Sequence, residues 1–202
     1  MNIIDFQRKL DKYQVFSLRD IEKIDPLFKR IQIDRWEKKG YIIKIKRGFY
    51  SLADNELSEQ FLLLTANRIY SPSYISLEKA LKFYGLIPEE VFQITSVSTK
   101  KTIHFQASIG SFSYCSIKPD LFWGYRLMEG RILMAEPEKA ILDYLYLHPE
   151  IKTADDFIEM RINTDSFRDK VDLKKFRIYA NAFKNKALLK RVKIFLKTIK
   201  ND

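Results

Sequence analysis

Apolar residues recur every three or four positions through the first forty residues of the chain, which is the period of an α-helix. The spacing predicts helices over Ile3–Tyr13 and Leu18–Ile24, with Ser17 as the N-cap of the second. A third helix is expected over Pro26–Lys39, because Asp25 can cap its first turn and proline is favoured at the first helical position.

The pattern then changes to the alternation of strands. Tyr41–Ile45 and Phe49–Leu52 alternate and are rich in β-branched and aromatic residues, and Lys46–Gly48 joins them as a short turn. Two helices followed by a hairpin predict a winged helix-turn-helix over Phe16–Leu52. Ala53–Asn55 is polar and small, so we place a domain boundary at residue 54.

The central part of the chain mixes helical and strand periods. Short turns such as Lys100–Lys101 between the expected strands predict antiparallel pairing. Helices are expected over Leu57–Tyr70, Leu77–Tyr84 and Glu136–Leu147, and strands over Val91–Ser98, Thr102–Ala107, Phe112–Ile117, Gly124–Met128 and Ile132–Met134.

The last fifty residues are helical in pattern, with helices expected over Ala154–Arg161, Leu173–Phe183 and Lys186–Ile199. The sequence therefore predicts an α+β protein. A winged helix-turn-helix in residues 1–54 precedes a mixed α/β domain in residues 55–202. This second domain contains an antiparallel sheet and ends in a basic helical tail from about residue 151.

Composition excludes several classes of protein. Hydrophobic residues make up 46% of the 202, which is enough for a packed core. No run reaches the roughly 18 apolar residues of a membrane span, and the N-terminus lacks the features of a secretory signal. A single cysteine, Cys115, and two histidines are too few for a disulfide framework or a closed zinc site. We expect a cytoplasmic protein without metal or cofactor.

The net charge of +10 is concentrated at the two ends of the chain. Residues 1–54 carry +5, residues 55–150 carry −2 and residues 151–202 carry +7. Two basic regions around a near-neutral middle favour a polyanionic partner. Solubility alone is the simpler explanation of this charge.

Arg and Gln side chains can pair bidentately with guanine and adenine, so the third helix is the expected base-reading element. Its apolar residues Leu27, Phe28, Ile31 and Trp36 are expected to face the core. The hairpin cations suit phosphates or a minor groove. The predicted DNA-binding residues are Lys29, Arg30, Gln32, Arg35, Lys38, Lys44, Lys46 and Arg47.

An enzymatic alternative rests on Glu136, Glu138 and Lys139, since metal-dependent nucleases combine paired carboxylates with a lysine. The same spacing has a structural explanation, which we favour. The two acids complement a helix N-terminus, and Lys139 and Asp143 form an ordinary i,i+4 pair. Alternatively, Asp143 is partly buried and ties the helix to the sheet. Neither histidine is placed to activate a serine nucleophile.

The amphipathic tail helices carry a second set of cations, which forms either a solvated face or a contact surface for flanking DNA or an acidic partner. Binding to a membrane surface is disfavoured, because the fold needs the apolar stripe. The candidate residues of this secondary basic surface are Lys174, Lys175, Arg177, Lys190 and Arg191.

The order of four segments resembles the AbiEi family of antitoxins. The first segment is the predicted winged helix-turn-helix. It is followed by SYISLEKALKFYGLIPE (Ser73–Glu89), FQITSVSTKKTIHF (Phe92–Phe105) and AEPEKAILDYLYL (Ala135–Leu147). The resemblance covers roughly residues 10–150. The Ser-Leu-Glu-x-Ala-Leu and Glu-Lys-Ala-x-Leu-Asp motifs are fairly specific when they occur together.

The resemblance implies a transcriptional regulator of a type IV toxin–antitoxin, or abortive-infection, system. The winged helix would bind double-stranded operator DNA with inverted repeats and repress its own operon. The C-terminal part would counteract a nucleotidyltransferase-like toxin without a stable complex. A protein-interaction module is a further alternative, since winged helices also serve that purpose.

Overall fold

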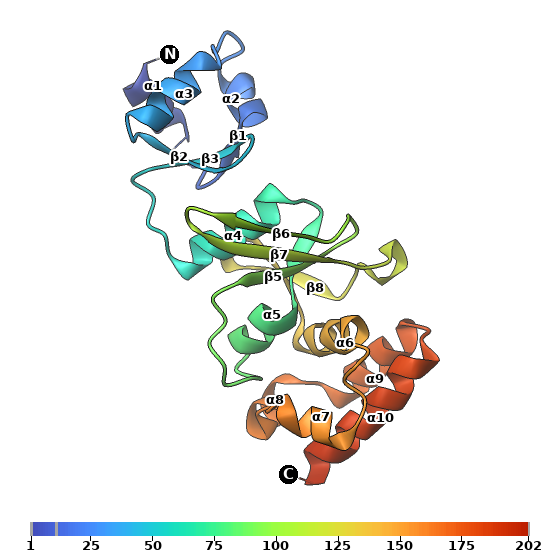
Figure 1. Cartoon of the computed structure of the whole chain (residues 1–202). Helices are drawn as coiled ribbons and strands as arrows, with labels where there is room; N and C mark the ends of the chain where they lie inside the picture. Colours follow the sequence, from blue (N-terminus) through green and yellow to red (C-terminus); the bar gives the residue numbers. More distant parts are fainter. Residues whose placement is uncertain (1, 11, 202) are drawn as a thin grey trace.

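The computed structural model describes residues 2–10 and 12–201, without the side chain of Asn201. The protein is α+β. Helices and a small sheet lie at the N-terminal end, a larger sheet lies in the middle, and a group of helices lies at the C-terminal end (Figure 1). No helix in the described part of the chain is long and apolar enough to cross a membrane.

Residues 2–54, which we call the N-terminal unit, form a three-stranded antiparallel sheet of order β1-β3-β2 with helices against it. The tight β2–β3 hairpin occurs where the sequence predicts it. The elements are α1 (Ile3–Leu10), β1 (Phe16–Ser17), α2 (Leu18–Ile24), α3 (Ile31–Lys38), β2 (Ile42–Lys46) and β3 (Phe49–Leu52).

Local chemistry accounts for two features of the N-terminal unit. Ser17 and Asp20 form a capping box at the start of α2, in which each side chain accepts a backbone amide of the other residue. Phe6 is fully buried, and its ring centre lies 4.4 Å from that of Trp36 and 5.5 Å from that of Phe16. Aromatic packing therefore fixes α1 onto α3 and β1.

The expected start of the third helix is wrong. Asp25 accepts the amide of Leu27 through its side chain, but the chain makes only a turn there, and α3 begins at Ile31. The shorter helix presents a different face to the core. Ile33 joins Phe28 and Trp36 in the core, whereas Leu27 is 89% and Ile31 56% exposed.

The expected antiparallel sheet is also corrected, because the central six-stranded sheet is mixed. Its order is β6-β7-β5-β4-β9-β8, with β4–β9 and β5–β7 parallel and the other pairs antiparallel. The chain leaves β5 for the edge strand β6 and returns as β7 between them, which makes β7 parallel to β5. The strands are β4 (Ser73–Ile75), β5 (Ile94–Ser98), β6 (Ile103–Ala107), β7 (Gly110–Ser116), β8 (Tyr125–Met128) and β9 (Ile132–Ala135).

Helices pack on this sheet and on one another. In Figure 1, α6 lies between the sheet and the C-terminal helices, and α9 and α10 contact it. Phe157, Phe167, Phe176 and Phe195 form an aromatic cluster that holds the C-terminal helices together. The helices are α4 (Glu59–Ile69), α5 (Leu77–Phe83), α6 (Pro137–Leu147), α7 (Ala154–Glu159), α8 (Thr164–Lys170), α9 (Leu173–Ala182) and α10 (Lys186–Asn201).

The described side chains form two buried clusters. One lies within the N-terminal unit, and the other extends from the central sheet to the C-terminal helices. Val15 and Ile45 come from the N-terminal unit but pack in the larger cluster. The N-terminal unit is therefore in contact with the rest of the chain, and a division at residue 54 stays a prediction.

Candidate nucleic-acid interface

Helix α3 and the residues just before it expose four of the seven cations that the sequence assigns to DNA. Lys29, Arg30, Arg35 and Lys38 are exposed, whereas Gln32 is half-buried. Burial of Ile33 and Trp36 on the opposite side orients this polar face toward solvent. Asp34 is exposed on the same helix, so the excess of positive charge comes from Lys29, Arg30 and Lys39 at its two ends. A helix that is anchored on one side and exposes cations on the other has the form required to enter a major groove.

Arg30 is not a free side chain. Its guanidinium donates to Glu22 Oε1 of α2, with the closest nitrogen at 2.7 Å, and its side chain is 70% exposed. Exposed ion pairs of this kind contribute about 0–1 kcal/mol, so the pair can open at little cost. Arg35 and Lys38 take part in no ion pair among the described residues, and they are the stronger candidates for contact with DNA.

The hairpin separates its three cations. Lys44 and Arg47 are exposed, and Arg47 lies in the turn before Gly48, whose φ of +84° is readily adopted only by glycine. A β-bulge between Lys44 and Lys46 shifts the register and turns the two lysines to different surroundings.

Lys46 faces the rest of the chain, away from the exposed basic surface. Its Nζ donates to the Ile69 carbonyl oxygen at 3.2 Å and lies 5.2 Å and 5.1 Å from the ring centres of Tyr70 and Phe105. Burial, and then the charge of Lys100, lower the pKa of Lys46. The structure therefore places this residue at the junction of the two parts, where it is poorly placed to bind phosphate.

Two of the five cations predicted for the secondary basic surface, Lys175 and Arg191, are likewise engaged by other groups of the protein. Lys174, Arg177 and Lys190 are exposed, but Lys175 Nζ lies 2.9 Å from Glu136 and 3.3 Å from Glu138. These contacts join α9 to the start of α6.

Arg191 is buried and has a structural role. Its guanidinium donates to the carbonyl oxygens of Leu145, His148 and Ile151, the second at 3.0 Å and the third at 3.4 Å. Carbonyl groups at the end of a helix lack partners within it, so Arg191 caps α6. It is therefore unavailable to a ligand.

The acids of the enzymatic alternative are engaged with other groups. Glu136 accepts the Tyr179 hydroxyl at 2.6 Å as well as Lys175, and Glu138 accepts the amide of Asp172 at 2.9 Å. Burial raises the pKa of Glu136, but Tyr179 and Lys175 outweigh it and hold the value below its usual range. The two carboxylates complete the contact between α6 and α9 and do not form an open pair.

Lys139 pairs with Asp143 in the interior, and both side chains are inaccessible to solvent. The hydroxyl groups of Tyr74 and Ser76 donate to Asp143 Oδ2, each at 2.9 Å, so the carboxylate ties α6 to β4 and its neighbour Ser76, which is the second of the two structural explanations. Burial lowers the pKa of Lys139 and raises that of Asp143, against the attraction between the two charges. Their partners are all within the protein, which is the arrangement of a structural pair.

Among the described residues, no group of three or more His, Cys, Asp or Glu side chains is placed to hold a metal ion.

Sequence reasoning missed two exposed cations of α2, Arg19 and Lys23. Their position in the first helix of the predicted helix-turn-helix could have identified them, because that helix crosses the DNA backbone in such motifs.

The comparisons with known proteins add no family: the chain matches neither a protein-family model nor a curated protein.

Proposed function

We propose that the protein is a DNA-binding transcriptional regulator whose N-terminal unit is a winged helix-turn-helix. The observation that carries this proposal is the succession α1-β1-α2-α3-β2-β3 with a β1-β3-β2 sheet and cations exposed on α3 and the hairpin. In this arrangement α3 enters the major groove and the hairpin forms the wing. Arg35 and Lys38 approach the bases, and Lys44 and Arg47 contact the backbone.

The resemblance to the AbiEi antitoxins gives the regulator a more specific role. In that role the protein represses its own operon and counteracts a nucleotidyltransferase-like toxin, while the residues beyond 54 carry the neutralising activity. The fold supports this division of labour, because α3 lies on the side of the N-terminal unit that faces away from the central sheet and the C-terminal helices (Figure 1).

The DNA-binding proposal is tested by fluorescence anisotropy with a labelled duplex from upstream of the protein's own gene. The variant Arg35→Ala/Lys44→Ala/Arg47→Ala is compared with Lys118→Ala/Lys152→Ala/Lys193→Ala, which removes the same charge from exposed sites outside the N-terminal unit. We expect the first variant to bind at least about tenfold more weakly at about 150 mM salt, and the second to bind like wild type. Equal losses in both variants would refute the assigned surface.

The antitoxin proposal needs a separate experiment. A nucleotidyltransferase-like toxin from the neighbouring gene is expressed with the full-length protein, and cell growth is measured. We expect the Arg35/Lys44/Arg47 variant to restore growth as wild type does when both are supplied from a heterologous promoter. Failure of the wild-type protein to restore growth would remove the antitoxin role and leave DNA binding untouched.

A protein-interaction role for the same unit is supported by one observation. Leu27 and Ile31 are exposed beside the N-terminus of α3, where apolar side chains can contact another protein or the methyl groups of thymine. If the full-length protein shifts no DNA from its own promoter region, while Leu27→Ser/Ile31→Ser disrupts a protein complex, the unit is an interaction module.

A further inference from the structure

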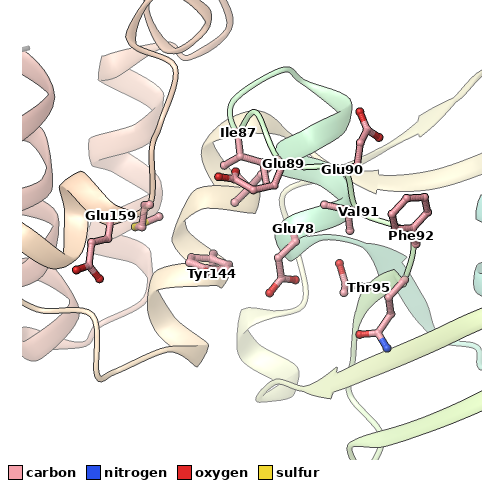
Figure 2. Close-up of a pocket in the computed structure, with 12 residues that line it drawn as sticks. Glu78, Ile87, Glu89, Glu90, Val91, Phe92, Thr95, Tyr144 and Glu159 are labelled. Carbon is pink, nitrogen blue, oxygen red and sulfur yellow. The ribbon is translucent and has the colours of Figure 1, made fainter.

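A pocket of about 640 Å³ lies on the central part of the chain, away from the N-terminal unit. Its walls come from α5 and the loop that follows, from β5, and from α6 and the end of α7 (Figure 2). The volume lies within the range of small-molecule sites, about 300–1,000 Å³. The apolar part of the lining includes Leu81, Ile87 and Val91.

The polar part of the lining is acidic, although the protein as a whole carries a net charge of +10. Glu78, Glu89, Glu90 and Glu159 all contribute to the walls. Glu89 and Glu90 are matched by nearby cations, since Arg161 lies 3.2 Å from the first and Lys82 lies 2.7 Å from the second. Among the described residues, Glu78 and Glu159 are in no ion pair.

Glu78 is the most informative of the four acids. Its Oε2 atom is buried and has no hydrogen-bond partner within the described part of the chain. Its position in the first turn of α5 is favourable for a negative charge, because the helix dipole is positive there. That position does not satisfy the buried oxygen, and buried polar atoms in folded proteins are nearly always satisfied. The oxygen is not exposed to the pocket, so the Glu78 carboxylate acts on a cation there through its unpaired negative charge and not through a hydrogen bond from this atom.

Tyr144 of α6 supplies an aromatic surface inside the same pocket. Figure 2 shows its ring between Glu78 and Glu159. Burial and the carboxylates of Glu78, Glu150 and Glu89 raise the pKa of Tyr144, which reflects the negative potential around it. An ammonium group beside this ring would gain both a carboxylate partner and a cation–π contact.

The acidic surface extends beyond this pocket. A smaller hollow of about 380 Å³ shares Tyr144, Glu159 and Met160 with it and is also lined by Glu150. Carboxylates therefore follow one another along a groove with apolar and aromatic walls between them. This alternation complements a flexible chain in which positive charges are separated by methylene groups.

We propose that this pocket binds a small aliphatic polyamine. One ammonium group lies beside Glu78 against Tyr144, and the methylene segments lie along Leu81, Ile87 and Val91. A second ammonium group lies on the other side of the ring, where Glu159 and Glu150 line the adjoining hollow. The proposal does not depend on DNA binding by the N-terminal unit.

The test is isothermal titration calorimetry of the full-length protein with spermidine at about 150 mM salt, where long-range charge attraction is screened. We expect wild type to bind one spermidine per chain, and Glu78→Gln/Glu159→Gln to bind at least about tenfold more weakly. The matched control is Glu56→Gln/Glu129→Gln, which removes two exposed acids outside the pocket and should bind like wild type. Thermal unfolding of each variant establishes that it is folded.

Three results would overturn the proposal. The first is that wild type releases no heat with millimolar spermidine. The second is that both double variants lose affinity equally. The third is that Mg²⁺ at equal charge concentration displaces spermidine fully. The last result would mean that charge alone, without the apolar walls, determines binding. Tyr144→Leu is the second probe of the site, and we expect it to weaken spermidine binding while leaving the carboxylates in place.

Discussion

At the scale of single residues, burial decides what a charged side chain does. Lys139, Asp143 and Arg191 are all charged types on helices, and a surface role is the first expectation for such residues. In the structure each is buried and satisfied by groups from distant parts of the chain. These side chains stabilise the fold, whereas exposed cations such as Arg35 remain available to a partner.

The pair of Lys139 and Asp143 leads to the first prediction. Asp143→Ala leaves the Lys139 ammonium group buried without a counter-charge, and breaking buried pairs in this way costs about 3–5 kcal/mol. The control is Asp165→Ala, which removes an exposed partner of Arg168 and should cost less than about 1 kcal/mol. Urea denaturation measures both free energies of unfolding. If the two variants lose equal stability, the interior pair does not stabilise the fold as argued.

Asp20 gives a prediction about pH. Burial raises the pKa of its carboxyl, but the hydrogen bonds from Ser17 and Arg68 outweigh it and hold the value below 3.8, its ordinary value. The unfolded state therefore binds a proton at higher pH than the folded state, so ionised Asp20 adds stability at neutral pH. That stability disappears as the pH falls from about 4 through the lower folded value.

The measurement compares wild type with Asp20→Asn, which keeps the shape and a capping oxygen but cannot ionise. We expect wild type to be the more stable at pH 7 and the difference to shrink as the pH falls below 3.8. Urea denaturation at a series of pH values gives the difference directly. A difference that stays constant between pH 7 and about 2.5 would contradict the assigned pKa.

At the scale of elements, two glycines with the same backbone conformation are expected to respond differently to substitution. Gly40 and Gly124 have φ of +72° and +73°. A Cβ at Gly40 would meet nothing within 4 Å, whereas a Cβ at Gly124 would lie 2.9–3.1 Å from the Lys139 side chain. Lys139 is buried and held by Asp143 and Tyr74, so it cannot move aside freely.

Gly40→Ala should therefore cost only the strain of a left-handed residue, about 1–2 kcal/mol. Gly124→Ala should cost that amount and, in addition, the energy of the clash, which for overpacked interiors is about 1–3 kcal/mol. Chemical denaturation of both variants gives the comparison. Equal losses would mean that the Lys139 side chain can rearrange, and the interior pair would then be less rigid than the contacts indicate.

Elements with strong local signals are the ones that the sequence predicts. The capping box of Ser17 and Asp20, the Asp172 side chain at the start of α9 and the apolar period of α10 are local signals, because each involves residues only a few positions apart. The strand β4 was missed because Ser73–Ile75 is too short to show alternation, although it lies in the middle of the sheet. Helix α8 was missed because Phe167 is its one buried residue, which gives no period.

The candidate site was predictable to a similar degree. The exposure of Arg35, Lys38 and Arg47 follows from the local pattern of the helix and the hairpin. The contact between Lys46 and the Ile69 carbonyl, 23 positions away, depends on how the two parts of the chain pack. The pairing of Lys175 with Glu136 depends likewise on tertiary structure, so residue type alone does not reveal the surroundings of either lysine.

At the scale of the whole molecule, the N-terminal unit is joined to the rest by specific contacts. Arg68 of α4 lies 2.8 Å from Asp20 at the start of α2, and Lys46 of the hairpin reaches the end of α4. Both contacts hold the exposed face of α3 at a fixed orientation to the central sheet. The hairpin thus exposes Lys44 and Arg47 to solvent, whereas Lys46 holds the hairpin against α4.

This division of the hairpin cations gives the last prediction, which concerns the salt dependence of DNA binding. Each phosphate contact releases counterions, so losing one contact makes the negative slope of log K against log salt shallower by about 0.9. We expect Lys44→Ala and Arg47→Ala each to reduce the magnitude of the slope by that amount. Lys46→Ala should leave the slope unchanged, because its ammonium group faces Ile69, Tyr70 and Phe105. Anisotropy titrations at four salt concentrations measure the slopes, and a reduced slope for Lys46→Ala would mean that the hairpin leaves its contact with α4 when DNA binds.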